Sequence, residues 1–547
     1  MKYLIIGGVA GGATVAARLR RMDETAQIIL FERGEYVSYA NCGLPYYIGG
    51  TIQERKSLFV QTAEGFRRRF CIDIRTNQEV SAIHPDLKTV EVRNLQTQET
   101  YLETYDKLVL SPGAEPLRPR IEGINHPRIF SLRSVPDTDT IKAFVQTPDI
   151  HRAVVVGGGF IGLEMAENLR HLGLDVHLVE MSNQVMAPLD YAMAAIVHHE
   201  LQQQGVELHL SDGVSRFSDT NGAVNVHLQS GTTLTADFVI LSIGVRPETK
   251  LAREAGLEIG KTGGIKVNDY LQTSNPDIYA LGDAIEVRHR VTGQPALIPL
   301  AGPANKQGRI VADNLVFGNQ RKYEGTQGTS IAKVFSLSVA ATGANAKLLD
   351  REHIPYLSSY THSCSHAGYY PGGAMLSILI HFSPRDGKLL GAQVVGAEGA
   401  DKRIEMFAQV IQRNGTVWDL TELEHAYAPP YSAAKDPVNM AGFVADNILT
   451  GKVKIITWNQ LPDYTDALQI DVRTPAEYRQ GSIPGFINIP LDELRGRLGE
   501  LPENKQQRIV VTCAVGLRGY LASRILMQHG YTEVYNLSGG YRTYSFL

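Results

Sequence analysis

Two cysteines, Cys42 and Cys513, lie in settings that could support thiol chemistry. Cys42 follows a strand expected to end at Glu32 and lies in a glycine-rich segment suited to the start of a helix. Because a helix N-terminus favours negative charge, this setting predicts a thiol pKa lowered toward thiolate. Cys513 follows an apolar strand in a loop before a helix, where N–H groups and Arg518 would stabilise an anion. The alternative for Cys42 is a small buried apolar residue, as free cysteines usually are.

Composition limits the classes of protein to consider. The 547 residues predict three to four domains, and the net charge of −4 gives no reason to expect a nucleic-acid partner. The four cysteines lack metal-ligand or CxxC spacing, which argues against a disulfide framework and a zinc site, so no metal is predicted. No apolar run is long enough to span a membrane, and we expect a cytoplasmic protein without a membrane partner.

A dinucleotide-binding pattern opens the chain. A short apolar strand, residues 3–6, runs into a glycine loop, an Ala/Arg-rich helix over 13–22 and a second strand ending at Glu32. In this pattern a helix N-terminus binds pyrophosphate and an acid binds a ribose hydroxyl. Val9 replaces the middle glycine of the fingerprint, so an ordinary strand–turn–helix is the alternative. The loop residues expected to bind a cofactor are Gly7, Gly8, Ala10, Gly11 and Gly12.

A second, complete fingerprint follows a strand over 153–156. Its glycines are Gly157, Gly159 and Gly162, and the next strand ends at Glu180. A carboxylate at that spacing accepts from a 2′-hydroxyl and repels a 2′-phosphate, which favours NADH while leaving NADPH open. The alternative for Glu180 is a plain surface residue at a strand end.

Two further segments make a family resemblance specific. Residues 105–114 form a strand running into a Pro-Gly turn, and residues 273–283 form a strand ending in Gly-Asp. Together with both fingerprints they resemble the flavoprotein disulfide reductases that carry two dinucleotide-binding domains. The resemblance implies that the first fold binds FAD, that the inserted second fold binds NAD(P)H, and that Asp283 holds the FAD ribityl chain. It also adds expected cofactor contacts from Ser111, Gly113 and Ala301.

The cysteine pattern narrows the family. Reductases with two redox cysteines have them four residues apart, whereas Cys42 has no such partner. A single cysteine must pair with a small thiol or cycle through a sulfenic acid. The sulfenic branch, the NADH oxidases and peroxidases, carries a histidine in the first glycine loop, where this chain has Ala10 and no histidine. The segment 38–47 resembles the remaining branch, the coenzyme A disulfide reductases.

That branch implies roles for further residues. In that family the third domain, here 323–451, forms a homodimer and brings two tyrosines to the other subunit's cysteine. Tyr369 and Tyr427 match these tyrosines best, and Tyr370 could replace Tyr369. A phenol can donate a proton to a leaving thiolate, and aromatic interface packing is the alternative. The role of the basic run 67–69 stays open. The resemblance assigns CoA binding to Thr14, Arg18, Arg21, Ser38, Asn41, Asn305 and Lys435.

The C-terminal part resembles a rhodanese domain. The segments 471–478, 481–490 and 537–541 carry this resemblance around Cys513, and four residues separate Cys513 from Arg518. A loop of that length suits a persulfide, whereas related phosphatase loops have five residues. Cys513 is therefore expected to carry sulfane sulfur, with an inactive rhodanese fold as the alternative.

These observations predict an α/β protein of several domains. The expected parts are a discontinuous FAD domain (1–150 and 245–322), an NAD(P)H domain (151–244), an α+β dimerisation domain (323–451), a linker (452–465) and an α/β rhodanese domain (466–547).

The predicted reaction is NADH-dependent reduction of small-molecule CoA persulfides, polysulfides or CoA disulfide through a Cys42–CoA mixed disulfide. FAD, NADH and coenzyme A are the implied cofactors. An NADH oxidase or peroxidase, a thiol-redox sensor, or a protein whose main activity is sulfur transfer are the alternatives.

Overall fold

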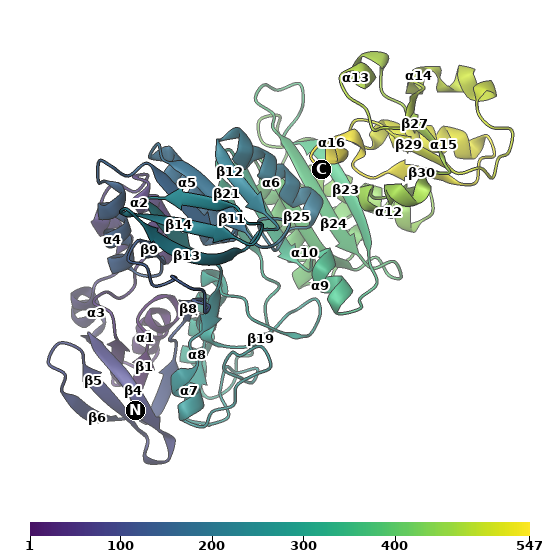
Figure 1. Cartoon of the computed structure of the whole chain (residues 1–547). Helices are drawn as coiled ribbons and strands as arrows, with labels where there is room; N and C mark the ends of the chain where they lie inside the picture. Colours follow the sequence, from purple (N-terminus) through teal and green to yellow (C-terminus); the bar gives the residue numbers. More distant parts are fainter. The chain divides into compact units, whose positions relative to one another are not determined.

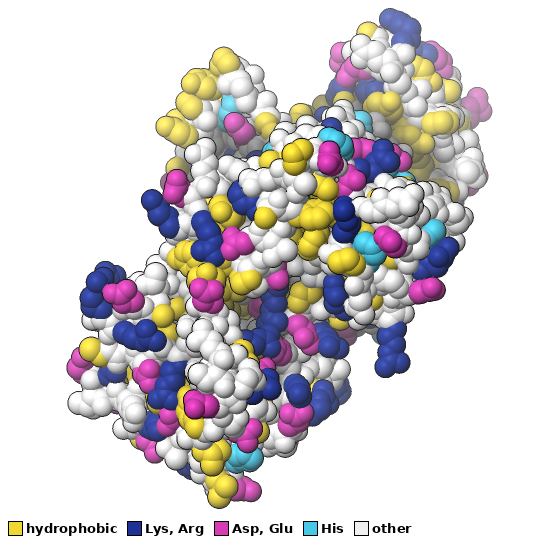
Figure 2. All heavy atoms as spheres, turned by 60° about the vertical axis from the view of Figure 1, so that its left-hand side comes forward, with side chains coloured by type: hydrophobic (Ala, Val, Ile, Leu, Met, Phe, Trp, Pro, Cys, Tyr) yellow, Lys and Arg dark blue, Asp and Glu magenta, His cyan; other side chains and the backbone are white.

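The structure is a computed structural model that describes residues 1–547, and they form two compact units. The first unit contains residues 1–185 and 204–328, and the second contains residues 186–203 and 329–547. No helix combines the length and the apolar character needed to cross a bilayer. Figure 2 shows basic and acidic side chains interspersed over the displayed face.

The first unit is built on two parallel five-stranded sheets (Figure 1). In each sheet the strand before a glycine loop lies in the centre, as the two fingerprints predict. The first sheet, in spatial order, is β18 (Ile278–Ala280), β7 (Lys107–Leu110), β1 (Lys2–Ile6), β2 (Gln27–Glu32) and β3 (Asp73–Thr76). The second is β12 (Val206–Leu210), β11 (Asp175–Glu180), β10 (Arg152–Val156), β16 (Phe238–Leu241) and β9 (Ile129–Phe130).

Helices and antiparallel strands complete this unit. The helices are α1 (Ala10–Met22), α2 (Leu44–Ile48), α3 (Ala63–Phe70), α4 (Val135–Val145), α5 (Phe160–His171), α7 (Lys250–Glu254) and α8 (Ala301–Phe317). The additional strands are β4 (Gln78–His84), β5 (Thr89–Asn94), β6 (Thr100–Thr104), β8 (Ala114–Pro116), β13 (Val214–Thr220), β14 (Ala223–Leu228), β15 (Thr233–Ala236), β17 (Val245–Pro247), β19 (Val287–Arg288) and β20 (Pro295–Ala296). Single 3₁₀ turns are η1 (Asn41–Gly43), η2 (Arg55–Leu58), η3 (Pro85–Leu87) and η4 (Gly282–Ala284).

The glycine-loop helices begin earlier than predicted. Helix α1 starts at Ala10 rather than residue 13, and α5 likewise starts at Phe160, before the last glycine of its loop. The reason is that the last glycines of each loop already adopt helical geometry inside the first turn. Apolar side chains of β1, β2 and β7 are fully buried, as strands covered on both faces require.

An antiparallel sheet forms the centre of the second unit. Its spatial order is β21 (Ser330–Val334), β22 (Leu337–Gly343), β25 (Leu389–Gly396), β24 (Met375–Phe382) and β23 (Leu357–Cys364). The accompanying helices are α6 (Tyr191–Gln203), α9 (Ala346–Arg351), α10 (Ala400–Gln412), α11 (Val417–Glu422) and α12 (Pro437–Leu449). Strands β24 and β25 are almost completely buried.

Helix α6 belongs to this unit, although the sequence placed residues 186–203 in the NAD(P)H domain. Asp190 at its start explains the difference. The Asp190 carboxylate accepts from His381 Nε2 at 2.6 Å and from Gln393 Nε2 at 2.8 Å. These buried polar contacts come from β24 and β25, residues that no local sequence pattern connects to α6.

The last domain is a parallel sheet within the second unit (Figure 1). Its spatial order is β26 (Lys454–Ile456), β30 (Val534–Leu537), β29 (Ile509–Thr512), β27 (Leu468–Asp471) and β28 (Ile487–Asn488). Its helices are α13 (Pro475–Arg479), α14 (Leu491–Leu494), α15 (Leu517–Gln528) and α16 (Gly540–Tyr544), with 3₁₀ turns η5 (Trp458–Tyr464) and η6 (Arg495–Glu500). Residues 452–465, expected as a linker, contain β26 and η5, and β26 pairs with β30. The short polar segment therefore contributes the edge strand of this sheet.

The last domain docks on β23 through buried polar contacts. The Tyr360 backbone N–H donates to Ser538 Oγ at 2.9 Å, and His362 Nε2 lies 2.8 Å from Thr543 Oγ1. Burial lowers the pKa of His362 to about 3, so the ring is neutral at physiological pH. A hydrogen-bonded and buried interface of this kind fixes the last domain on the antiparallel sheet.

Candidate functional site

Both glycine loops contain one position that only glycine can occupy. Gly7 has φ +99°, and a Cβ there would lie 2.1 Å from the Ser111 carbonyl oxygen. Gly157 has φ +105°, and its Cβ would lie 2.4 Å from the Ser242 carbonyl oxygen. At each of these glycines the left-handed backbone turns the chain sharply from the sheet into the following helix. The close carbonyl oxygen leaves no room for a side chain.

The two acids at the strand ends occupy equivalent positions. Glu32 Oε2 accepts from the Gly8 backbone N–H at 2.8 Å, and Glu180 Oε2 accepts from the Gly158 backbone N–H at 2.8 Å. Each carboxylate is held beside the second residue of its glycine loop, where a ribose hydroxyl lies in dinucleotide-binding folds. The structure thus brings together the loop and acid that were predicted separately in each half.

The second loop and Asp283 fit a bound dinucleotide and a flavin. A Cβ at Gly159 would meet no protein atom within 4 Å, so protein packing does not require glycine there, while a closely approaching pyrophosphate would. Asp283 lies in η4, burial raises the pKa of its carboxyl, and no protein group donates a hydrogen bond to it. A half-buried carboxyl without a protein donor suits a ligand hydroxyl.

The remaining predicted cofactor residues are Ser111, Gly113 and Ala301. Ser111 follows β7, and its hydroxyl would lie 2.6 Å from a Cβ at Gly11. Gly113 has φ +76°, and a Cβ there would meet no protein atom within 4 Å. Ala301 is the exposed first residue of α8. All of these residues lie in the first unit.

Cys42 is exposed within η1, directly before α2. Its thiol pKa is raised rather than lowered, first by burial of the surrounding site and then by the carboxylates of Glu164 and Asp283. The predicted lowering is therefore wrong for the protein alone. Helix α2 spans only five residues, so its dipole is weak, and two negative charges oppose the thiolate.

Sequence reasoning missed Glu164 and Tyr46 beside Cys42. The pKa of Glu164 is raised to about 7, first by burial and also by the nearby Glu167, while a hydrogen bond with Tyr46 partly opposes the rise. A carboxyl that titrates near neutral pH can hold or release a proton beside a thiol. The available signal was two acids, Glu164 and Glu167, one turn apart on an otherwise apolar helix start.

Four of the predicted CoA residues lie along α1 and α8. Thr14 Oγ1 donates to Asn305 Oδ1 at 2.7 Å, which ties the two helices together. Arg18 is paired with the buried Asp313 at 2.8 Å, whereas Arg21 is exposed and donates only to the Ala17 carbonyl. Asp313 neutralises much of the Arg18 charge, so Arg21 is the freer cation for a phosphate.

The other three predicted CoA residues are divided between the two units. Ser38, with φ +48°, donates its backbone N–H to the Gly8 carbonyl at 2.8 Å, and Asn41 is exposed at the start of η1. Lys435 is exposed in the second unit. Ser38 therefore connects the first glycine loop to the segment that carries Cys42.

The two predicted tyrosines meet in the second unit. The hydroxyls of Tyr369 and Tyr427 are 2.6 Å apart, although 58 residues separate them in the chain. Both rings are exposed, and the hydrogen bond with Tyr427 raises the pKa of Tyr369. Tyr370 instead contacts the His366 ring edge-to-face at 5.6 Å. The geometry favours Tyr369 over Tyr370 as the partner of Tyr427.

A buried ion pair holds the segments that carry these tyrosines. Arg403 Nη2 donates to Asp436 Oδ2 at 2.8 Å and to the Ser365 carbonyl at 2.7 Å, and both charged groups are buried. Ser432 joins the pair by donating to Asp436 at 2.6 Å and accepting from the Ala367 backbone N–H at 2.9 Å. A fully paired buried charge fixes both loops at once. The sequence did not predict Arg403 and Asp436, because both residues are buried and their task is to hold the two loops in place.

Cys513 lies buried at the end of β29, in a loop closed by α15 and α16. The Gly516 backbone N–H donates to its sulfur at 3.1 Å. The Cys513 carbonyl accepts from the Tyr541 backbone N–H at 2.7 Å, which ties the loop to the helix turn docked on β23. The loop thus presents one backbone donor to the sulfur, whereas several were predicted.

Arg518 is held by a residue that sequence reasoning did not single out. Its two guanidinium nitrogens donate to the Glu477 carboxylate at 2.7 and 2.6 Å. This bidentate pair is the main reason that the pKa of Glu477 falls to about 2, and the Arg518 pKa rises from the same pair and from proximity to Cys513. The capping-box pattern Thr474-Pro-Ala-Glu477 was the visible signal, and it caps α13.

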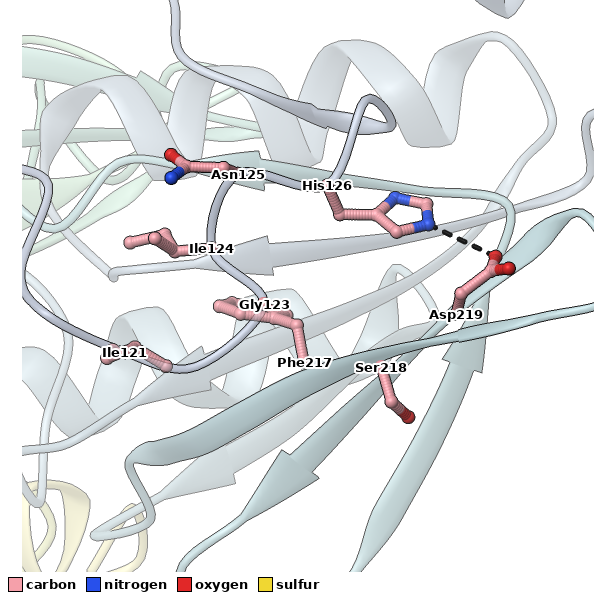
Figure 3. A pocket seen from close by; sticks show the side chains of 8 residues that line it. All are labelled: Ile121, Gly123, Ile124, Asn125, His126, Phe217, Ser218 and Asp219. Atoms are coloured by element: carbon pink, nitrogen blue, oxygen red, sulfur yellow. Dashed lines mark hydrogen bonds and ion pairs between the residues drawn. The ribbon is translucent and has the colours of Figure 1, made fainter.

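The first unit contains a small hollow (Figure 3). It measures about 230 Å³ and lies between the loop 121–126 and β13. His126 Nε2 faces the exposed Asp219 carboxylate across it at 3.2 Å. None of the predicted site residues lines it.

Family models match three consecutive parts of the chain. The pyridine nucleotide-disulphide oxidoreductase model matches residues 1–308, the dimerisation domain of the same family matches residues 329–437, and the rhodanese-like domain matches residues 458–545. The chain belongs to the pyridine nucleotide-disulphide oxidoreductase family. The third match confirms the predicted rhodanese resemblance and includes most of the segment that had been expected as a linker.

Relatives of this oxidoreductase include proteins of the predicted branch. A coenzyme A disulfide reductase of Staphylococcus haemolyticus is 37% identical over 82% of this chain and 100% of its own length. The crystal structure of reduced Bacillus anthracis CoADR-RHD covers 100% of this chain and 98% of its own, with 51% identity and a TM-score of 0.97. A NAD-dependent persulfide reductase from A. fulgidus covers 100% of both chains, with 36% identity and a TM-score of 0.94. The predicted fold class and family are thereby confirmed.

Proposed function

We propose that this oxidoreductase uses NADH to reduce CoA persulfides, polysulfides and CoA disulfide through Cys42. The observation that carries the proposal is a single cysteine in the redox motif of a chain that matches a NAD-dependent persulfide reductase over its full length. Without a second cysteine in that motif, the redox disulfide of Cys42 must form with a substrate thiol. The curated coenzyme A disulfide reductases provide the chemical identity of that thiol.

The proposed cycle balances in two steps. The Cys42 thiolate attacks the CoA-bound sulfur of a CoA persulfide, forms a Cys42–S–S–CoA disulfide and expels hydrosulfide. Two electrons and one proton then convert that disulfide to the Cys42 thiolate and free CoA thiol. Bound FAD would carry the two electrons from NADH to the disulfide. With CoA disulfide as substrate, the first step expels CoA thiolate instead of hydrosulfide.

Residues of the first unit have distinct tasks in this proposal. Glu32 and Asp283 bind FAD hydroxyls, and Glu180 binds the NADH ribose and disfavours the 2′-phosphate of NADPH. Glu164 holds a proton beside the Cys42 thiol at the lower end of the neutral range, because its pKa is raised to about 7, and its ionised form opposes the thiolate. Arg21, Ser38 and Asn41 bind the CoA phosphates and amides, with Thr14, Arg18, Asn305 and Lys435 as further CoA contacts.

The second unit completes the site from another subunit. The chain forms a homodimer through its dimerisation domain, and the Tyr369–Tyr427 pair lies near the partner subunit's Cys42. One phenol donates a proton to the leaving CoA thiolate. The other phenol holds the first in place through the 2.6 Å hydrogen bond between the two hydroxyls. Cys513 carries sulfane sulfur to CoA, and Arg518 stabilises its persulfide anion.

The deciding experiment is anaerobic NADH consumption with CoA persulfide and CoA disulfide at matched concentrations. Cys42→Ser should lose both activities, and Cys71→Ser, a change at an exposed cysteine of the same unit, should keep them. Faster turnover of the persulfide would identify a sulfur-reducing enzyme; faster turnover of the disulfide would identify an enzyme that maintains CoA thiol. Rapid oxygen-dependent NADH consumption without CoA species would instead identify an NADH oxidase and contradict the proposal.

A further inference from the structure

Three side chains with metal-ligating atoms converge on the second parallel sheet, outside the sites described above. His177 lies on β11, and Glu207 and His209 lie on β12. The parallel register pairs His177 with Glu207 and Val179 with His209. Because residues two apart on a strand face the same side, this register gathers all three side chains on one face at the sheet edge.

The separations of their ligand atoms match a tetrahedral metal site. His177 Nδ1 lies 3.2 Å from His209 Nε2. The Glu207 carboxylate places Oε2 3.5 Å from His177 Nδ1 and Oε1 3.5 Å from His209 Nε2. Zinc bonds of about 2.0–2.1 Å in a tetrahedron separate ligand atoms by about 3.3 Å. All three observed separations lie close to that value, so an ion fits with only small side-chain movements.

Burial and ring arrangement also fit a bound cation. The side chains of His177 and His209 are 9% and 16% exposed, while Glu207 is 61% exposed and leaves the cluster open to solvent on one side. The imidazole rings are stacked with centroids 5.5 Å apart.

A fourth residue lies beside one of the ligands. Asp175 Oδ2 lies 3.7 Å from His177 Nε2, the nitrogen that faces away from the cluster. A carboxylate on this side of the ring resembles the outer carboxylate of carboxylate–histidine–zinc arrangements, although 3.7 Å is longer than a hydrogen bond. Asp175 is itself fixed by Arg152 at 2.8 Å.

We propose that His177, Glu207 and His209 bind a divalent transition-metal ion, with zinc as the best match and water as the fourth ligand. Two imidazoles and one carboxylate favour zinc and its neighbours over magnesium or calcium, which prefer oxygen ligands. The ion would crosslink β11 and β12 three residues before Glu180. The sequence predicted no metal because the ligands are too few and too dispersed for a motif, and only strand pairing assembles them.

The site is independent of the proposed reaction, and its test measures binding. Zinc is titrated calorimetrically into the full-length flavin-loaded protein without an affinity tag. The chain should bind one more zinc ion than the His177→Gln/His209→Gln double variant. Both proteins keep all four cysteines, so zinc bound by thiols cancels in the comparison. His84→Gln, a change at an exposed histidine on β4, should bind as the unchanged protein does.

Two further measurements keep the result decisive. His209→Gln alone alters a partly exposed ring and should weaken zinc binding at this site by at least about 100-fold. An anomalous difference map at the zinc edge should show a peak between His177, Glu207 and His209. Equal zinc stoichiometry in the unchanged protein and a folded double variant, or a map without that peak, would overturn the proposal.

Discussion

Cys42 and Cys513 both follow a strand and precede a helix, but different groups lie beside the two sulfur atoms. Cys42 is exposed beside the carboxylates of Glu164 and Asp283, and its pKa is raised. Cys513 is buried, its sulfur accepts a backbone N–H, and its nearby charged residue is Arg518. Position at a loop-to-helix junction therefore does not define thiol chemistry. The donors that reach sulfur and the sign of nearby charge decide it.

This difference predicts that the two thiols perform separable reactions. The strongest test replaces each cysteine in turn and measures both reactions in each variant. Cys42→Ser should lower NADH-driven reduction about a thousandfold or more and leave transfer of sulfur from thiosulfate to cyanide unchanged. Cys513→Ser should do the reverse, with NADH-dependent reduction of CoA disulfide kept. Steady-state rates of both reactions measure this, and a single variant that abolishes both in a folded protein would contradict the separation.

The charge beside Cys513 gives the next largest effect. Arg518→Lys should lower sulfur transfer about 100-fold, because lysine cannot keep the bidentate contact to Glu477 while facing the sulfur. The rate of NADH-driven CoA disulfide reduction serves as the internal control and should not change. Sulfur transfer that survives Arg518→Lys within about twofold would show that the backbone donors alone suffice.

The tyrosine pair tests whether Cys42 needs a proton donor from elsewhere. Tyr427→Phe should lower kcat for CoA disulfide reduction about tenfold and leave KM nearly unchanged, since only the leaving thiolate would lose its donor. Trp418→Phe, a change at an exposed aromatic residue of the same unit, is the control. If the tyrosines only pack an interface, Tyr427→Phe should instead weaken dimerisation, measured by sedimentation, without a specific loss of kcat.

The smallest predicted effect concerns the charge beside Cys42. Above its pKa of about 7, Glu164 is mostly ionised and opposes the Cys42 thiolate. Glu164→Gln removes that charge, so the Cys42 pKa should fall by about half a unit and alkylation near pH 8 should become about threefold faster. The pH profile of iodoacetamide alkylation measures this shift. A profile that moves to higher pH, or does not move, would show that burial alone raises the pKa.

Much of the architecture was predictable because its signals are local. The glycine fingerprints predicted both parallel sheets, and the acids at Glu32 and Glu180 lie beside their loops as their spacing requires. The resemblance around Cys42 and Cys513 predicted the family. Element boundaries were less accurate: the helices began within the glycine loops, and β26 formed inside an expected linker by pairing with β30.

The electrostatics of the sites were decided by tertiary structure. Glu164 reaches Cys42 from α5, Glu477 reaches Arg518 from α13, and Arg403 connects two loops from α10. None of these pairs is close in sequence, so no periodicity or spacing reveals them.

The amino-acid sequence by itself determined which residues bear chemistry and which folds present them, because glycine conformations and strand-end acids act over a few residues. Tertiary structure alone decided the charge that each thiol experiences, the meeting of Tyr369 with Tyr427, and the gathering of His177, Glu207 and His209. The physical reason is that electrostatic and hydrogen-bond energies depend on distance in space, which the packing of sheets and helices sets only after the chain has folded.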